Sequence, residues 1–472
     1  MKLDFLNEPR LIFANGNHIC PRRGITAYGV FDQTQESRRS EIHIGGIGTA
    51  EGIETLGRWL ERCKEGIAAP ADARQQNLRL DFCGFNKSHG FHAEMHFGSD
   101  LGRSIKNSDI GRVVNITSRT ERIDAALELY YEEIKFLAQN RHVDVIVCVL
   151  PENLYDAISS EENPGQDTLE DDLPSEELNF RRALKAKAMP LGKPLQLVRQ
   201  VSLDGTKVRE QQDDATKAWN FCTALYYKSG PTIPWKLENE QSRGTSCAIG
   251  IAFYRSRDRA TLRTSLAQIF DELGNGLILR GTPVQLDKDD RIPRLSAEQA
   301  HNLFSAALKE YRIAMRNFPA RVVVHKSSNF TPEEIAGIED AAQELRIDAV
   351  DFVTIMDSRF RLFRDGQYPP FRGTLARVES DRHLLYSRGS VWYYQTYPGL
   401  YVPQPIELRI VKSEESPRLI ANEILGLTKM NWNNTQFDGK YPVTLGCARK
   451  VGEVMKYLSE TDTPQVRYGY YM

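Results

Sequence analysis

The sequence predicts an α/β protein of two or three domains, and three observations lead to this prediction. The chain has 472 residues, of which 41% are hydrophobic and 26% are charged, as in a soluble protein with substantial cores. In the first half, helical periodicity alternates with short apolar runs. After Pro234 the pattern changes to successive strands joined by short polar turns. A small disulfide-stapled scaffold is therefore excluded.

The elements of the first half predict a Rossmann-like, mostly parallel sheet over residues 1–236. Ile123–Leu137 repeats apolar residues at helical spacing, and His142–Pro151 (HVDVIVCVLP) is typical of a strand buried on both faces. A helix, a strand and a helix are then expected at Arg181–Lys187, Leu195–Leu203 and Asp214–Lys228.

The second half, residues 237–472, predicts a mixed sheet surrounded by helices. Its first strands are expected at Cys247–Arg255, Thr261–Gln268 and Gly276–Arg280. A long helix over Ala297–Asn317 leads to a strand at Arg321–His325. The next helix begins at Thr331 with an N-cap, a proline and a capping-box glutamate. Later strands and two closing helices complete the layout of an RNase H-like domain.

Several classes of protein are disfavoured. No run approaches the roughly 20 apolar residues that span a bilayer. Asp4 and Glu8 interrupt what would be the apolar core of a secretion signal. The seven cysteines are scattered, with no CxxC pair, so they indicate neither a disulfide framework nor a zinc site. We therefore expect a cytoplasmic protein without a membrane partner.

Local charge is more informative than the whole-chain balance of 61 Lys and Arg against 63 Asp and Glu. Residues 159–178 contain eight acids and no Lys or Arg, which is typical of a solvated loop. Residues 180–203 contain six bases and no acid, so they are a candidate anion-binding segment.

Four residues in and after this basic segment could bind a phosphate. Arg181 and Lys185 share one helix face, Gln196 begins the next strand, and Lys228 ends the following helix. Three cations and an amide suit a terminal phosphate, which has about −1.5 to −2 charges. On spacing alone, the same bases are also typical of a scattered, solvated surface.

These residues resemble a known site. The pattern Arg181-x3-Lys185-x10-Gln196, followed by Asn220-x7-Lys228-Ser229-Gly230-x3-Pro234-Trp235, resembles the guide 5′-phosphate pocket of the MID domain of Argonaute proteins. Ser229 and Pro231 depart from the family pattern. Residues 8–13 (EPRLIF), 427–433 (LTKMNWN) and 442–445 (PVTL) resemble the opening and the end of short prokaryotic Argonautes, so the resemblance extends along the whole chain.

The resemblance implies a MID domain within residues 1–236 and an RNase H-like PIWI domain within 237–472. It implies that Arg181, Lys185, Gln196 and Lys228 bind the guide phosphate. In several Argonautes the C-terminal carboxylate helps to hold Mg²⁺ at this phosphate, so the terminus of Met472 is a candidate metal ligand. A frayed C-terminal tail is the alternative.

The resemblance also implies that this PIWI domain is inactive. Cleaving members hold two metal ions with a cluster of carboxylates. Three of those positions read Ala252 (in Gly-Ile-Ala), Ser327 (after His-Lys) and Arg449 (after Ala). None of the three can supply a carboxylate, so we expect no catalytic residues in this chain.

The function implied by the resemblance is that of a guide-RNA-binding subunit in a prokaryotic immune complex. Such a subunit recognises complementary single-stranded DNA of plasmids or phages. It then activates an APAZ-containing effector in a heterodimer, with NAD⁺ depletion and abortive infection if the effector is sirtuin-like, which we favour, or of the TIR type. Two alternatives remain open: a guided endonuclease that acts alone, and an α/β protein that binds a small phosphorylated ligand.

A further candidate surface lies in residues 359–372, where arginines are interleaved with aromatic residues. This mixture suits a nucleic-acid backbone or a protein partner. It is also the pattern of one face of a strand.

Overall fold

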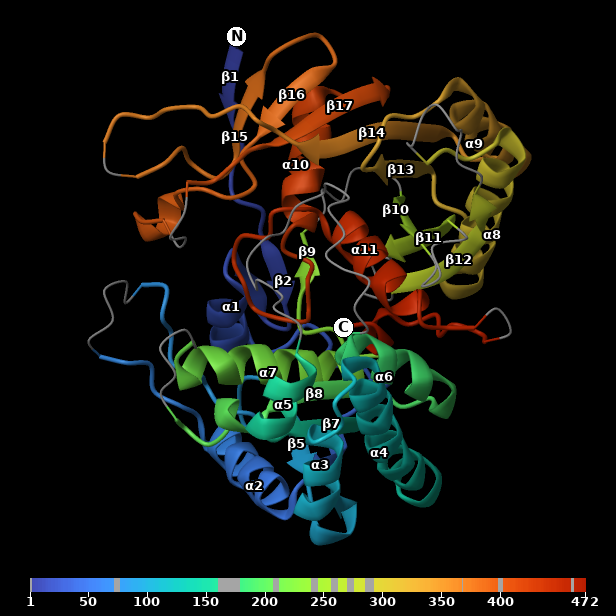
Figure 1. Ribbon diagram of the computed structural model, residues 1–472. Helices are drawn as coiled ribbons and strands as arrows, with labels where there is room; N and C mark the ends of the chain where they lie inside the picture. The colour runs from blue at the N-terminus through green and yellow to red at the C-terminus, as the bar shows by residue number, and fades with distance from the viewer. Residues whose placement is uncertain are drawn as a thin grey trace.

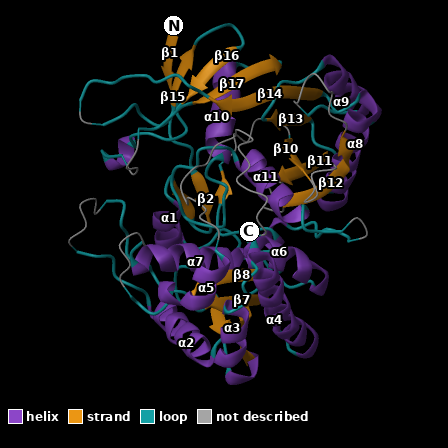
Figure 2. Ribbon diagram, viewed as in Figure 1, coloured by secondary structure: helices purple, strands orange, loops and turns teal. Residues whose placement is uncertain are grey.

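The protein forms two lobes (Figure 1). The first is built on a five-stranded sheet and the second on a nine-stranded sheet. The computed structural model describes residues 2–71, 77–159, 179–206, 212–238, 245–255, 262–269, 276–284, 293–366, 368–397, 402–459 and 462–472. Helices cover strands in both lobes (Figure 2), so the α/β prediction is confirmed. No helix in these ranges is long and apolar enough to cross a membrane.

The first lobe is built on a five-stranded, all-parallel sheet of order β5-β4-β7-β8, with β6 also paired to β4. Its strands are β4 (Glu41–Gly48), β5 (Glu94–His96), β6 (Gly102–Ser104), β7 (Val145–Leu150) and β8 (Leu195–Arg199). Its helices are α2 (Ala50–Glu65), α3 (Asn107–Val114), α4 (Arg119–Asn140), α5 (Glu152–Ile158), α6 (Phe180–Ala188) and α7 (Asp214–Ser229). Every residue of β7 is buried, as its continuous apolar run predicts.

One predicted boundary in this lobe is wrong. The strand expected at Leu195–Leu203 ends at Arg199, and a short 3₁₀ turn follows. The carboxylate of Glu152 explains the difference, because it ion-pairs with Arg199 and also accepts the backbone N–H of Val201 at 3.3 Å. The chain therefore turns toward α5 instead of continuing the sheet.

The second lobe is built on a nine-stranded mixed sheet of order β1-β15-β16-β17-β14-β13-β10-β11-β12. Its strands are β1 (Lys2–Phe5), β10 (Ser246–Arg255), β11 (Leu262–Ile269), β12 (Gly276–Val284), β13 (Arg321–Lys326), β14 (Ala349–Asp357), β15 (Thr374–Arg377), β16 (Arg382–Leu385) and β17 (Ile406–Lys412). β13 is parallel to β10 and β14, and the other pairs are antiparallel.

Helices pack on both faces of this sheet. On β13, Val322 and Val324 pack with α8 (Ala297–Met315) and α9 (Pro332–Glu344), whereas Val323 packs with α10 (Pro417–Leu427). Alternate residues of one strand therefore face opposite helix layers, as strand geometry requires. The last helix, α11 (Val443–Met455), contributes to the core that also includes α7 of the first lobe.

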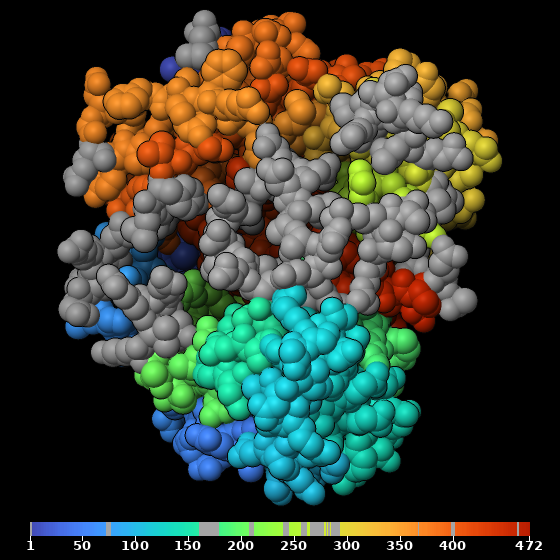
Figure 3. Space-filling view, viewed as in Figure 1, coloured from blue at the N-terminus to red at the C-terminus, as the bar shows by residue number. Residues whose placement is uncertain are grey.

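The lobes share a core along their seam. A small sheet of β2 (Leu11–Phe13), β3 (Gly16–His18) and β9 (Lys236–Leu237), with α1 (Pro21–Tyr28), lies between them. The Trp432 indole donates to the carbonyl of Trp235 at 3.1 Å, and its ring stacks on Tyr227 with centroids 5.0 Å apart. In space-filling view, the cyan and green first lobe forms the lower body and the orange and yellow second lobe the upper body (Figure 3).

The N-terminal strand connects the two halves of the sequence. β1 pairs with β15 at the edge of the nine-stranded sheet, so residues 2–5 join the second lobe. Glu8 then lies between Arg372 and Lys429 of the second lobe, at 3.0 and 2.6 Å. The domain boundary between residues 236 and 237 stays a prediction. β1 precedes this boundary in the sequence but pairs with a strand of the second lobe.

Candidate functional site

The C-terminus lies beside two lysines at the seam between the lobes, and we call this place the predicted phosphate pocket. Lys185, in the middle of α6, donates to a terminal oxygen of Met472. Lys228, in the last turn of α7, packs against the same tail, since a Cβ added to Gly469 would lie 3.7 Å from its Cα. Figure 1 places the C-terminus just above α6 and α7.

The tail is packed and not frayed. Met472 is buried, the Tyr470 hydroxyl donates to the carbonyl of Gly192 at 2.9 Å, and the Tyr471 hydroxyl donates to that of Gln465 at 2.8 Å. These bonds fix the terminal carboxylate beside Lys185. The structure therefore brings Met472 to the predicted phosphate residues.

The protonated forms of Lys185 and Lys228 are both disfavoured. Burial and the nearby charges of Arg181 and Lys450 lower the pKa of Lys228 to about 7. Burial, Lys228, Arg181 and Lys450 also hold the pKa of Lys185 well below its ordinary value. The positive charges of Arg181 and Lys450 therefore act on both lysines, and an incoming multivalent anion would relieve this repulsion.

Gln196 lies in the predicted strand, but its side-chain amide bonds to the backbone of α7. It is the second residue of β8 and is buried, and its Nε2 donates to the carbonyl of Phe221 in α7 at 3.2 Å. Its Oε1 is buried without a hydrogen-bond partner. The second hydrogen of Nε2 could still bond to a phosphate oxygen, whereas Oε1 only accepts hydrogen bonds, so Gln196 offers a phosphate one uncharged donor.

The other bases of the predicted segment are engaged outside the pocket. Arg182 pairs with Glu453 of α11 at 2.8 Å, Lys187 pairs with Glu128, and Arg199 pairs with Glu152. Lys193 donates to the carbonyl of Val143 at 2.7 Å. The basic segment therefore separates into structural ion pairs and a convergent group, which sequence spacing alone does not distinguish.

The exposed residue Lys450 lowers the pKa of both lysines, although the sequence pattern did not include it. It belongs to α11 in the second lobe, and α11 packs on α6, where Asn179 N–H donates to the Tyr457 hydroxyl at 2.9 Å. No local pattern marks Lys450, because the sequence separates it widely from α6 and α7. Its role depends on the packing of the lobes.

Two of the three positions that the resemblance assigns to metal ligands lie side by side, and the third lies on the helix that packs on one of their strands. β10 and β13 are parallel neighbours with Ile251 opposite Lys326, so Ala252 and Ser327 follow side by side at the same end of the sheet. Arg449 lies on α11, which packs so closely on β10 that a Cβ at Gly250 would be 2.3 Å from the carbonyl of Thr444. The side chains at the three positions are a methyl, a hydroxyl and a guanidinium.

Comparison with solved structures identifies the architecture. The chain superposes on Clostridium butyricum Argonaute bound to a guide DNA and a 19-mer target DNA with a TM-score of 0.68 and 15% identity, covering 99% of this chain and 54% of that one. Drosophila Piwi gives a TM-score of 0.61 at 15% identity, covering 100% and 56%. Marinitoga piezophila Argonaute in complex with 5′-OH guide RNA gives 0.61 at 12% identity, covering 100% and 59%.

The chain has an Argonaute-like fold. It spans a little over half the length of these solved structures, and at this identity the likeness concerns the fold. No protein-family model and no curated protein sequence matches the chain.

Within this Argonaute-like fold, residues 359–366 and 368–372 belong to none of the named strands, so the interpretation as a strand face is wrong. Arg372 is buried and structural, because it pairs with Glu8 and donates to Thr428 Oγ1 at 2.8 Å. Arg364 stacks over Phe371 at 3.9 Å, while Phe363 is fully exposed. A nucleic-acid or protein surface at the exposed residues stays a prediction.

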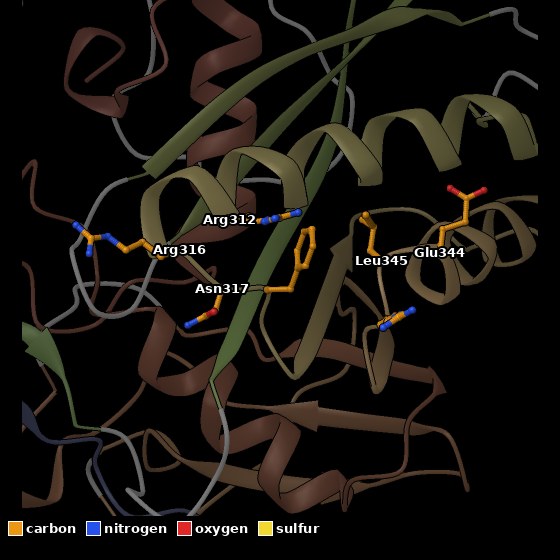
Figure 4. Close-up of a pocket in the computed structure, with 7 residues that line it drawn as sticks. Arg312, Arg316, Asn317, Glu344 and Leu345 are labelled. Carbon is orange, nitrogen blue, oxygen red and sulfur yellow. The ribbon is translucent and has the colours of Figure 1, made fainter.

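A depression of about 500 Å³ lies elsewhere, at the C-terminal ends of α8 and α9. Arg312, Arg316 and Arg346 contribute positive charge to it, and Figure 4 shows Glu344 at the end far from Arg316. Arg312 also stacks over Phe318 at 5.2 Å. Cations here are expected on structural grounds alone, because they complement the negative ends of the two helix dipoles.

Proposed function

We propose that this chain is a guide-binding protein of the short prokaryotic Argonaute type. In this proposal the first lobe acts as a MID domain and the second as a PIWI domain. The observation that carries it is the placement of Lys185 and Lys228 beside the C-terminal tail, with the charges of Arg181 and Lys450 acting on both lysines, in an Argonaute-like fold. The guide would be an RNA with a 5′-phosphate.

The pocket chemistry suits a terminal phosphate. A phosphate monoester has three strong acceptor oxygens and close to two negative charges at neutral pH. Burial lowers the pKa of both lysines, and the charge of Lys228 lowers that of Lys185 further, so a bound anion would favour the protonated form of both. Charge-assisted hydrogen bonds to phosphate are roughly twice as strong as neutral ones.

Mg²⁺ binding at Met472 stays a prediction, because the protein oxygen atoms there supply only part of the coordination that Mg²⁺ needs. Mg²⁺ needs about six oxygen ligands. The terminal carboxylate of Met472 is one such donor, and Lys185 already bonds to it. Phosphates of the guide would have to supply the other oxygens, so we assign the binding itself to the protein's cations.

In the proposed function the guide pairs with a single-stranded DNA target, and the protein contacts backbones while base pairing reads the sequence. We propose that the chain does not cut this target. In-line phosphoryl displacement on two metal ions needs carboxylate ligands, and Ala252, Ser327 and Arg449 offer none.

The biological setting is proposed from the sequence resemblance. Target recognition would activate an APAZ-containing effector, sirtuin-like or TIR, in a cytoplasmic heterodimer that defends against plasmids and phages by depleting NAD⁺. Purification with co-purifying short RNA and an effector-bearing protein would support this setting. Purification as a nucleic-acid-free monomer from well-expressed cells would oppose it.

The pocket is tested by the double variant Lys185→Ala/Lys228→Ala. Removing two charge-assisted contacts should weaken binding of a 5′-phosphorylated guide RNA by roughly 100-fold or more, at about 1.5–3 kcal/mol for each contact. Binding of the same RNA with a 5′-hydroxyl should fall only a few-fold. Both affinities are measured by filter binding at one fixed salt concentration.

A matched control is Lys187→Ala/Lys193→Ala, which removes two nearby lysines engaged with Glu128 and Val143. This control should leave the preference for the 5′-phosphate unchanged. Equal losses for both RNAs in the pocket variant would show that these lysines do not bind the phosphate. Affinity insensitive to RNA length and to salt would favour a small phosphorylated ligand instead.

A further inference from the structure

Three groups of possible metal ligands lie among the described residues, and two of them already hold a cation of the protein. The groups are His43/His142/Asp144, Glu41/Glu94/His96 and His301/Asp340/Glu344. In the first, Arg39 ion-pairs with Asp144. In the second, Lys87 bridges the two glutamates at 3.1 and 2.7 Å. A metal ion would have to displace these side chains.

The third group differs, because the imidazole nitrogen that faces its two carboxylates is not accompanied by a paired Lys or Arg among the described residues. His301 Nε2 lies 3.6 Å from Asp340 Oδ2 and 3.2 Å from Glu344 Oε2. Among the described residues, no Lys or Arg forms an ion pair with either carboxylate. A lone pair on Nε2 directed at two anions is unfavourable unless a proton or a cation lies between them.

We propose that His301, Asp340 and Glu344 form a binding site for Zn²⁺ or a similar divalent transition-metal ion. Zn²⁺ bonds to imidazole nitrogen and carboxylate oxygen at roughly 2.0–2.2 Å, so two ligand atoms of a tetrahedral site are about 3.4 Å apart. The distances of 3.2 and 3.6 Å bracket this value. A water molecule would complete the coordination.

The two helices hold these ligands on a rigid frame. α8 and α9 both begin with a capping box, at Ser296 and Thr331. They approach so closely that a Cβ at Gly337 would lie 2.1 Å from the backbone oxygen of Ala297. His301 follows Ala297 by one turn, and Asp340 follows Gly337 by three residues, so the close contact sets the spacing of the ligands.

A neighbouring side chain supports the imidazole. His301 Nδ1 lies 3.5 Å from Asn302 Oδ1, which places an acceptor beside the nitrogen that does not face the carboxylates. This is the kind of outer partner that fixes the tautomer of a ligating histidine. Asp340 and Glu344 are 68% and 62% exposed, so an ion can enter from solvent and binding should be weaker than at a closed structural site.

The site is tested by titrating Zn²⁺ into the full chain without guide, followed by isothermal calorimetry near neutral pH. The wild type should bind one equivalent that His301→Ala and Asp340→Asn/Glu344→Gln each weaken by about tenfold or more. Glu344→Lys should lose the same equivalent, because its ammonium group occupies the position of the ion. Circular dichroism checks that each variant is folded.

The matched control is His142→Ala, which removes a histidine from the first group. It should leave the affinity and the stoichiometry of the wild type unchanged. The proposal is overturned if the wild type binds no Zn²⁺, if the three variants at His301, Asp340 and Glu344 bind as the wild type does, or if His142→Ala alone removes the equivalent. None of these outcomes depends on guide binding.

Discussion

Lys228 is a buried amine whose proton depends on what fills its pocket. Its pKa of about 7 reflects burial and the like charges of Arg181 and Lys450. An unfolded chain would hold this proton up to about the ordinary value of 10.5. Between these values the unfolded state binds more protons than the folded state, so in the guide-free protein this group makes the free energy of unfolding rise with pH.

Guide affinity should therefore depend on pH. Binding a phosphate above pH 7 requires Lys228 to take up a proton, so the affinity for a 5′-phosphorylated RNA should fall between pH 7 and 9. The limit is about tenfold per pH unit for one proton. The phosphate itself is almost fully ionised in this window, because its second pKa is about 6.

The control for this prediction is the same RNA with a 5′-hydroxyl. Its affinity, measured by fluorescence anisotropy across the same pH range, should change much less. If the affinities for the two RNAs change with pH in the same way, binding of the 5′-phosphate does not cause Lys228 to take up a proton.

Residue by residue, the sequence predicted part of this pocket. Lys185 and Lys228 could be found because each has a fixed position in a helix and a family pattern around it. Lys450 could not be found, since its approach depends on how α11 packs against α6. The orientation of the Gln196 side chain could not be predicted from the sequence either, because a backbone carbonyl of α7 sets it.

At the scale of elements, the crossing of α8 and α9 depends on one glycine. Gly337→Ala should destabilise the protein by about 1–3 kcal/mol, because its Cβ would lie 2.1 Å from the Ala297 backbone oxygen and force the helices apart. The same change should weaken Zn²⁺ binding by separating His301 from Asp340. Chemical denaturation measures the first effect.

The matched control is Gly111→Ala in α3, where an added Cβ meets nothing within 4 Å. It should be neutral or stabilising by up to about 1 kcal/mol, since alanine favours a helix interior more than glycine does. If both substitutions have the same effect, the close crossing does not limit the packing of α8 and α9.

Elements with strong local signals were predictable. The capping box at Thr331 and the apolar run of β7 mark their elements without help from the rest of the chain. β1 lacks such a signal, because residues 2–5 are mostly exposed and become a strand only by pairing with β15. The early end of β8 likewise depends on Glu152 in another element.

At the scale of the whole molecule, a buried ion cluster connects the start of the chain to the second lobe. Burial raises the pKa of Glu8, but Arg372 and Lys429 outweigh it and hold the value below normal. Lys429 also donates to the carbonyls of Pro9 and Ile19 at 2.9 and 2.7 Å. The conspicuous residues 8–13 therefore have a structural role in the seam.

Removing this charge should be costly. Glu8→Gln leaves two buried cations without their anion and should destabilise the protein by roughly 3–5 kcal/mol. Asp4→Asn is the control, because its pair with Arg418 is about half exposed and should contribute at most about 1 kcal/mol. Urea denaturation compares the two, and similar small losses would show that the cluster does not stabilise the seam.

In the proposed function, the predicted phosphate pocket at the seam holds the 5′-phosphate of a guide. The most direct measurement is the ratio of dissociation constants of the wild-type protein for one RNA with a 5′-hydroxyl and with a 5′-phosphate, at pH 7 and fixed salt. The pocket of Arg181, Lys185, Lys228 and Lys450 predicts at least tenfold tighter binding of the phosphorylated RNA. Equal dissociation constants would contradict the claim.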